Sequence, residues 1–319
     1  MTMLMLLGAL QVLTLLLVGP LFANFIRIVH ARLQGRQGPP LLQAHYDILK
    51  LLQKDRIYSV RSSFVTRITP AVNFAAICVA ALLVPVLSTT VPFHFAGDFI
   101  FFIYLFGLAR FLTALTGLDA GSTFGGMASS REMTLSSLAE PAILLGFIVI
   151  STAAGSMDIS VMTAQLIDLP GKYVNPFFIL TLLSFSIVIM AENGRVPFDN
   201  PTTHLELTMV HEGMVLELSG RDLGVFQWAH AARLLALTIV ALDVFFPFGI
   251  ATEVTAYALL ISLGALLLKL FIAAVLVAYV ETANAKYRLF RLPDLLTLAF
   301  VFSLIALIAY YATEVAGAR

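Results

Sequence analysis

The sequence is poor in charged residues and has a single cysteine. Only 12% of its 319 residues are charged, against about 25% in a typical soluble domain, which excludes an ordinary water-soluble protein. Lysine plus arginine (19) balance aspartate plus glutamate (19), so the chain lacks the basic field that nucleic-acid binding needs. Cys78 alone cannot form an internal disulfide, a zinc site or an iron–sulfur site. We therefore expect no cofactor in this chain, and any redox cofactor would belong to another subunit.

Long apolar runs are the main feature that the chain does have. Hydrophobic residues make up 60% of the sequence, and its mean hydropathy is +0.94. A helix needs about 20 mainly apolar residues to cross a bilayer, and runs of that kind lie at about 3–25, 70–92, 97–116, 134–154, 173–192, 229–250, 255–280 and 294–313. They are too long and continuous for barrel strands. We predict an all-α polytopic membrane protein with about eight transmembrane helices in a single domain, 1–319.

Lysine and arginine residues are concentrated in alternate connections between these runs. Fourteen of them lie on one side, and only Lys172 and Arg319 lie on the other. Since positive charge marks the cytoplasmic side, we expect cytoplasmic docking loops in the cell (inner) membrane and both termini outside. These loops span about 26–69, 117–132, 194–226 and 281–293. No lysine or arginine precedes the first run, which favours a retained helix over a cleaved signal peptide.

The first of these loops contains a helical apolar pattern. Pro39-Pro40 suits a helix start, and a mainly apolar stripe then follows at helical spacing, made of Leu41, Leu42, His45, Ile48, Leu49 and Leu52. The polar residues Asp47, Lys50 and Lys54 lie off this stripe. We predict an amphipathic helix on the cytoplasmic side, which lies either on the lipid surface or under a partner subunit.

The second loop, 117–132, is rich in glycine and serine and could be a plain flexible loop. It leads into a span that carries Glu132 and Glu140. On a helix these two acids are about 80° and 12 Å apart, so they share one broad side without touching. A carboxylate inside a span is costly and normally faces a protein or water interior. Pro141 follows Glu140, and a loosened backbone there also admits water.

The third loop contains the densest set of titratable groups. It holds Glu192, Asp199, Glu206, Glu212, Glu217 and Asp222, with His204, His211 and Arg195 among them. If 202–219 is helical, Glu206 and Glu217 share one face, and His204 and His211 share another.

Three interpretations of this set stay open. The pair His211-Glu212 lacks the second histidine of the HExxH zinc motif, so metal binding is the weakest. The second interpretation is an ordinary solvated helix on the surface, without a functional role. The third is a series of carboxylates and histidines with shifted pKa values, which passes protons between a cytoplasmic module and the membrane interior.

Further charges lie in apolar context in the spans. The predicted buried charges are Asp243, Lys269, Arg110, Arg233 and Glu281. Asp243 and Lys269 could form a static ion pair. A buried lysine also suits charge switching, because its pKa moves readily.

Two long motifs resemble one protein family. They are Gly121-Ser122-x-Phe124-Gly125-Gly126-Met127-x-Ser129-Ser130-Arg131-Glu132-Met133 and Ala191-Glu192-x-x-Arg195-x-Pro197-Phe198-Asp199-Asn200-Pro201-x-Thr203-His204-Leu205-Glu206. With the eight spans and the amphipathic helix, they resemble the membrane-anchor subunit shared by respiratory complex I (subunit 1 or H) and the group 4 [NiFe] hydrogenases. Within that superfamily the chain is most similar to the formate hydrogenlyase and hydrogenase-4 branch.

The resemblance implies a membrane subunit without a redox centre of its own. A peripheral subunit with a [4Fe–4S] cluster and a large subunit with nickel and iron would dock on the cytoplasmic loops, beside antiporter-like membrane subunits. Glu132 and Glu140 would match acids near the start of an internal proton path. Glu192, Arg195, Asp199 and Glu206 would match the inner loop and its entry, and Glu212 and Glu217 would belong to the same path.

Two alternatives stay open at this point. The chain would be the quinone-binding subunit of NADH-quinone oxidoreductase if it follows the complex I branch. It would be a stand-alone cation-coupled transporter if it needs no redox partner, although no internal repeat typical of many transporters is visible.

Overall fold

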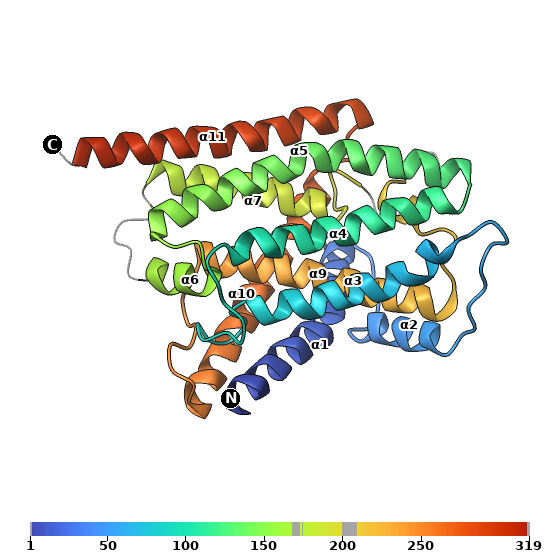
Figure 1. The fold of residues 1–319 in the computed structure, drawn as a ribbon, viewed down its shortest axis with the longest axis horizontal. Helices are drawn as coiled ribbons and strands as arrows, with labels where there is room; N and C mark the ends of the chain where they lie inside the picture. The colour runs from blue at the N-terminus through green and yellow to red at the C-terminus, as the bar shows by residue number, and fades with distance from the viewer. Residues whose placement is uncertain (1, 168–172, 174, 200–208, 318–319) are drawn as a thin grey trace.

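The protein folds as a bundle of long α-helices (Figure 1). The computed structural model describes residues 2–167, 173, 175–199 and 209–317, and within them there are helices and no strand. The helices are α1 (Thr2–Leu33), α2 (Gln43–Leu52), α3 (Phe64–Leu83), α4 (Asp98–Asp119), α5 (Thr123–Ala154), α6 (Ile159–Ile167), α7 (Pro176–Glu192), α8 (His211–Met214), α9 (Gly220–Phe245), α10 (Ala256–Ala283), the 3-10 helix η2 (Leu289–Arg291) and α11 (Leu292–Gly317).

The predicted class, an all-α polytopic membrane protein, is confirmed. In the described part of the chain, seven helices are long and apolar enough to cross a membrane: α1, α3, α4, α5, α9, α10 and α11. The eighth expected span is α7, an apolar helix of 17 residues, which rises about 26 Å and so meets the lower limit for a crossing. Both ends of the chain lie toward the left of Figure 1, whereas α2 and the turn between α4 and α5 lie toward the right, as eight crossings require.

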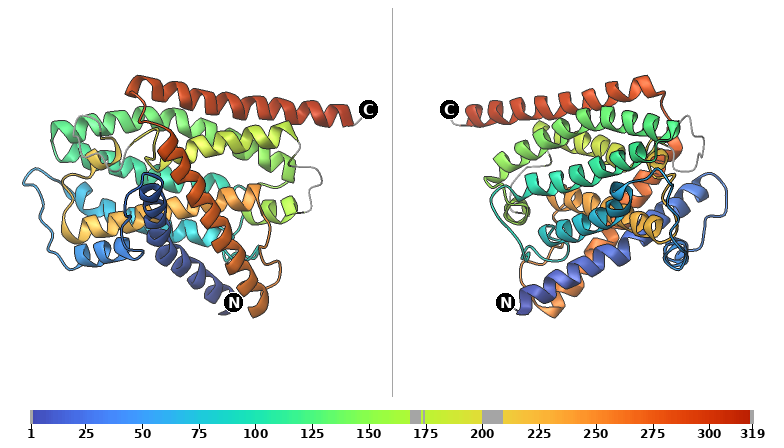
Figure 2. Two further views of the ribbon diagram at one scale, coloured as in Figure 1. Left: turned by 180° about the vertical axis from the view of Figure 1, so that it is seen from behind. Right: turned by 45° about the vertical axis from the view of Figure 1, so that its right-hand side comes forward.

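Helix α9 lies at the centre of the bundle. In the apolar window of this span 56% of the residues are buried, and α9 packs against α1, α3 and α7. Helix α1 approaches α9 closely at Gly19, where an added Cβ would lie 2.8 Å from Ala232 Cα. Small residues at such a crossing let two helices touch through their backbones. Helices α10 and α11 lie at the periphery, and only 22% of the residues in their apolar windows are buried (Figure 2).

The predicted amphipathic helix is confirmed as α2, which packs on α9 and α1. Its buried residue is Ile48, as the apolar pattern indicated. Leu41, Leu42 and Leu49 belong to the same pattern but are exposed. The helix therefore presents apolar side chains on two sides, one toward the bundle and one away from it.

The plain flexible loop considered for 117–132 is not what the structure shows. Helix α4 continues to Asp119 and α5 already begins at Thr123. Ser122 caps α5, since its side chain accepts a 3.0 Å hydrogen bond from Gly125 N. Gly117 and Gly125 lie in direct contact, where neither has room for a Cβ. The glycines here therefore serve close helix packing instead of flexibility.

The continuous helix considered for 202–219 is wrong for its described part. Only His211–Met214 is helical, and Glu217 lies in the irregular turn that follows. Asp199 Oδ2 accepts hydrogen bonds from Val210 N (3.0 Å) and His211 N (3.2 Å), which offers the backbone a non-helical alternative. Glu206 and His204 lie outside the described residues.

Candidate functional site

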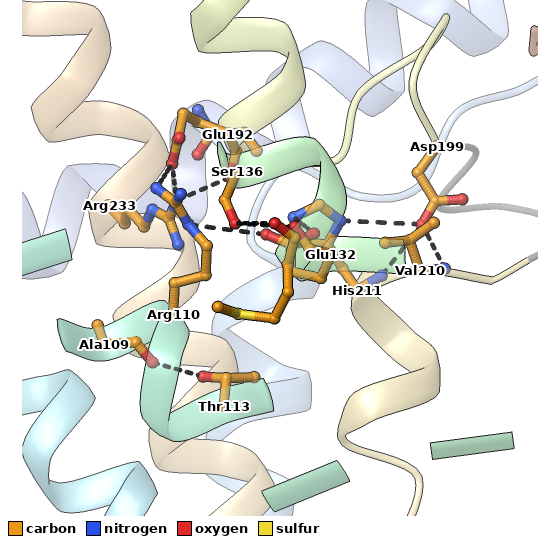
Figure 3. A network of polar contacts seen from close by, with 12 residues as sticks. Ala109, Arg110, Thr113, Glu132, Ser136, Glu192, Asp199, Val210, His211 and Arg233 are labelled. Atoms are coloured by element: carbon orange, nitrogen blue, oxygen red, sulfur yellow. Dashed lines mark hydrogen bonds and ion pairs between the residues drawn. The ribbon is translucent and has the colours of Figure 1, made fainter. Parts of the chain in front are cut away.

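Arg110 of α4 is the centre of a network of buried charges (Figure 3). Its Nη2 donates to Glu192 Oε2 at 2.5 Å, and its Nη1 donates to Glu140 Oε1 at 3.1 Å. Its Nε lies 3.7 Å from Glu132 Oε1. One guanidinium thereby contacts three carboxylates from α5 and α7, which suits the planar, multiply donating arginine side chain better than a lysine.

Glu192, the last residue of α7, has a second cationic partner. Arg233 of α9 donates from Nη2 to Glu192 Oε2 and, at 3.0 Å, to the Glu192 backbone carbonyl. Both side chains are buried. A buried carboxylate is tolerated only when it is paired and hydrogen-bonded, and here two guanidinium groups meet that requirement.

His211 links this cluster to the connection between α7 and α9. Its Nε2 lies 3.4 Å from Glu132 Oε2 and its Nδ1 lies 3.9 Å from Asp199 Oδ2. Burial acts to lower the pKa of His211, but the carboxylates of Glu132 and Asp199 outweigh burial and raise the pKa above its ordinary value of 6.5. His211 is therefore poised to hold a proton between two acids.

Asp199 ties two connections together. Lys286, between α10 and α11, donates a 2.6 Å hydrogen bond from Nζ to Asp199 Oδ1. Tyr287 N donates to Pro197 O at 3.0 Å beside it. Burial acts to raise the pKa of Asp199, but hydrogen bonds and positive charge from His211 and Lys286 hold it well below the ordinary value. Asp199 thus stays an anion and fixes the position of His211.

A cavity of about 670 Å³ adjoins the network. Arg110, Glu132, Asp199 and His211 line one part of it, and residues of α1, α2 and α9 line the rest. Asn73 Oδ1 and Asn193 Oδ1, on residues of the same wall, are buried without a hydrogen-bond partner among the described protein atoms. A cavity with such polar atoms suits water or a polar ligand group.

A second, smaller cavity of about 390 Å³ lies at the other end of the network, between α4 and α5. Tyr104, Gly107 and Ser136 line it together with Arg110 and Glu140. Gly107 leaves room for the carboxylate, since an added Cβ would lie 3.6 Å from Glu140 Oε1. The Glu140 side chain is 33% exposed. The network therefore extends from the larger cavity to a lateral surface of the bundle.

The family of the chain follows from its comparison with known proteins. The family model described as NADH dehydrogenase matches residues 5–312. Formate hydrogenlyase subunit 4 of Escherichia coli (strain K12) is 34% identical over 302 residues, which cover 95% of this chain and 97% of that protein. The chain belongs to the NADH dehydrogenase subunit 1/H family. Hydrogenase-4 component C of the same organism is 33% identical over 297 residues, which cover 93% of this chain and 92% of that protein.

A solved structure shows the same fold in a chain of another assembly. The membrane-bound sulfane sulfur reductase, an archaeal respiratory membrane complex, contains a chain that matches with a TM-score of 0.84. The match covers 96% of this chain and 99% of that one at 20% identity. The resemblance inferred from the two motifs is thereby confirmed at the level of family and fold. The chain is a membrane subunit of the family that complex I and the group 4 hydrogenases share.

Several of the site residues predicted from the sequence lie together in the network around Arg110. Five of them are Glu132, Glu140, Glu192, Asp199 and His211, and Arg110 and Arg233 join them from the predicted buried charges. Glu212 lines the larger cavity. Glu217 lies in the turn after α8 and has no place in the network. Among the described residues, no group of three or more His, Cys, Asp or Glu side chains is arranged so that it could hold a metal ion.

The other predicted charges form two separate pairs. Arg195 Nη1 lies 3.3 Å from Glu281 Oε1, which joins the end of α10 to the connection after α7. Lys269 Nζ lies 3.6 Å from Asp243 Oδ1 and donates to Phe246 O at 3.3 Å. Asp243 lies ten residues after Arg233 on α9, about 15 Å along the helix.

The sequence reasoning missed two residues. Lys286 was counted only as a loop charge, although it lies 2.6 Å from Asp199. His230 of α9 lines the larger cavity, with its ring centroid 6.3 Å from that of His211. The sequence could have indicated His230, because it lies three residues before the predicted buried charge Arg233 and therefore on the same face of the helix.

Proposed function

We propose that this chain is the membrane subunit of a multi-subunit [NiFe] hydrogenase of the formate hydrogenlyase or hydrogenase-4 type, in which it anchors the redox module and provides a proton path. The observation that carries the proposal is the series of ionisable side chains that joins the two cavities. It runs from Lys286 through Asp199, His211, Glu132 and Arg110 to Glu140, with Glu192 and Arg233 attached to Arg110.

The proton path works through the carboxylates and the histidine, while the arginines keep their charge. Arg110 stays protonated and contacts Glu132, Glu140 and Glu192. A change of charge in the larger cavity alters the field at His211 and Glu132. A proton held on His211 then moves to Glu132, either directly or through one water molecule, since His211 Nε2 and Glu132 Oε2 are 3.4 Å apart. Its onward transfer to Glu140, which lies on the other side of Arg110 and does not touch Glu132, would use water molecules.

The likeness to formate hydrogenlyase subunit 4 and hydrogenase-4 component C supports the choice of partners. A peripheral iron–sulfur subunit with a [4Fe–4S] cluster and a nickel–iron large subunit would dock where α8 and the connections around Asp199 lie. Electron transfer and hydrogen chemistry would take place in those subunits. In this arrangement the docking end is cytoplasmic, and both termini lie on the outer side of the cell membrane.

Purification of the tagged chain from its native membrane in a mild detergent tests this assignment. The co-purified complex is assayed for nickel, iron and flavin, and for hydrogen evolution with a reduced dye. We expect nickel and hydrogen evolution. Flavin with quinone reduction and no nickel would instead place the chain in NADH-quinone oxidoreductase. A stable chain without any redox partner would favour the transporter.

A further inference from the structure

Three cations at the opening of the larger cavity have no acidic partner. Arg27 of α1, Lys50 of α2 and Lys54 just after α2 line this cavity and are exposed, so they lie where it opens. Within the described residues, none of the three forms an ion pair or a side-chain hydrogen bond. The arginines farther inside, such as Arg110 and Arg195, are all paired with carboxylates. The opening therefore carries positive charge that no described residue neutralises.

Two acids outside the buried network, Asp47 and Glu212, also line the cavity. Asp47 Oδ1 accepts a 2.8 Å hydrogen bond from Gln43 Nε2, and Glu212 is half-buried. The three cations outnumber these two carboxylates. An anionic group that enters the opening gains charge-assisted hydrogen bonds from two ammonium groups and one guanidinium, a combination that suits a phosphate.

The outward face of α2 is apolar. Leu42, Tyr46 and Leu49 recur every three or four residues, and their exposed fractions are 45%, 57% and 54%. The opposite side of α2 carries Ile48, which is buried, and Leu51, which packs against Gly224 of α9. An exposed apolar strip on a helix already packed on its other side has the character of a lipid contact.

The lysines flank this apolar strip. Lys50 lies about 70° around the helix from the centre of the strip, between the outward face and the buried face. That is where an interfacial helix places its cations, with the apolar strip in the acyl region and the ammonium groups at the level of the headgroups. Helix α1 continues the apolar surface beside it with exposed leucines, among them Leu13 and Leu17.

We propose that this opening binds the phosphate headgroup of an anionic phospholipid through Arg27, Lys50 and Lys54, while its acyl chains lie outside the cavity along α1 and the apolar face of α2. The inner part of the cavity is lined by Arg110, Glu132 and His211 and is too polar for an acyl chain. Only the headgroup therefore enters. A lipid in this position closes the cavity toward the membrane and holds α2 on α9.

Lipid retention by the full-length chain tests the proposal independently of hydrogen chemistry. The purified chain is equilibrated with mixed micelles of phosphatidylglycerol or phosphatidylcholine, and the retained lipids are counted by native mass spectrometry. We expect one phosphatidylglycerol to be retained in preference to phosphatidylcholine. The double variant Lys50→Gln/Lys54→Gln should bind it roughly 20- to 30-fold more weakly, about fivefold for each lysine removed.

Two further variants isolate the role of these lysines. Lys50→Arg/Lys54→Arg keeps both charges and should retain the lipid. Arg32→Gln/Arg36→Gln removes two exposed cations from the same connection that do not line the cavity, and it should also retain the lipid. Thermal unfolding of each variant confirms that it is folded before its lipid is counted.

Several outcomes would overturn the proposal. One is equal loss of phosphatidylglycerol from the Arg32/Arg36 variant, which would indicate nonspecific surface charge. Another is displacement of the lipid by millimolar inorganic phosphate, which would indicate a site for a free anion. A third is an assembled complex that retains no lipid and crosslinks Lys50 to an acidic segment of another subunit, which would assign the opening to a protein partner.

Discussion

Arg110 of α4 donates a 2.5 Å hydrogen bond to Glu192 at the end of α7, and both side chains are buried. This contact joins two helices that are far apart in the sequence. Because Arg110 also contacts Glu132 and Glu140, its removal would leave three carboxylates with a reduced or lost cationic partner.

Replacement of Arg110 should therefore be strongly destabilising. For Arg110→Met we expect the free energy of unfolding to fall by about 3–5 kcal/mol, the cost of breaking a buried ion pair from one side. Thermal unfolding of the purified chain in detergent measures this change. Arg32→Met, which removes an exposed cation, is the matched control and should change stability by less than about 0.5 kcal/mol. Similar melting temperatures for the two variants would contradict the account.

The raised pKa of His211 predicts a pH-dependent contribution to stability. Burial opposes the proton on His211, but Glu132 and Asp199 favour it more strongly. The stabilisation is therefore fully present below the ordinary pKa of about 6.5 and is lost as the pH rises through the folded value. We expect the difference in stability between the wild type and His211→Gln to be largest near pH 6 and to shrink at higher pH. Melting curves between pH 6 and 9 measure it, and a difference that grows with pH would refute the assignment.

The contact between Lys286 and Asp199 predicts a local effect. Lys286→Met should lower the free energy of unfolding by about 1–2 kcal/mol, a charged hydrogen bond discounted because the lysine side chain is 23% exposed. Amide hydrogen exchange should become faster at 195–199 and 283–288. Arg288→Met, in the same connection and exposed, should leave both segments protected. Unchanged exchange in Lys286→Met would show that this contact does not hold the two connections together.

The ion pair between Asp243 and Lys269 predicts that its two residues contribute to stability only together. Lys269→Met leaves the fully buried Asp243 without its cation and should destabilise the chain by about 3–5 kcal/mol. The double variant Asp243→Leu/Lys269→Met should recover most of that loss, because apolar side chains replace the whole pair. The melting temperatures of both variants measure these changes in stability. A double variant no more stable than Lys269→Met would show that the two residues do not act as a pair.

The sequence predicted the spans well because long apolar runs leave few alternatives in a bilayer. Its errors arose where tertiary contacts decide the structure. The glycines at 117 and 125 indicate a loop by composition, but in the fold they allow two helices to touch. The backbone at Val210 leaves the helical path because Asp199, eleven residues earlier, accepts its N–H. No local pattern contains that information.

For the site, the sequence indicated which residues are chemically unusual but not how they pair. Arg110 and Glu192 are 82 residues apart, and Lys286 and Asp199 are 87 apart. A buried charge is stable only with a partner. The sequence therefore predicted that the charged residues inside apolar runs form pairs. The identity of each partner depends on how the helices pack, which apolar periodicity alone does not determine. Lys286 was missed for this reason.

The most direct test of the proton path uses Glu140, the residue of the network at the lateral cavity. The native complex purified with the tagged chain, a hydrogenase by the proposed function, is reconstituted into vesicles with a pH-sensitive dye inside, and hydrogen evolution and internal pH are recorded together. The account predicts that Glu140→Gln assembles and evolves hydrogen but no longer changes the internal pH. Glu253→Gln, an exposed acid outside the network, should behave as the wild type. A Glu140→Gln complex that still moves protons at the wild-type ratio to hydrogen would contradict the account.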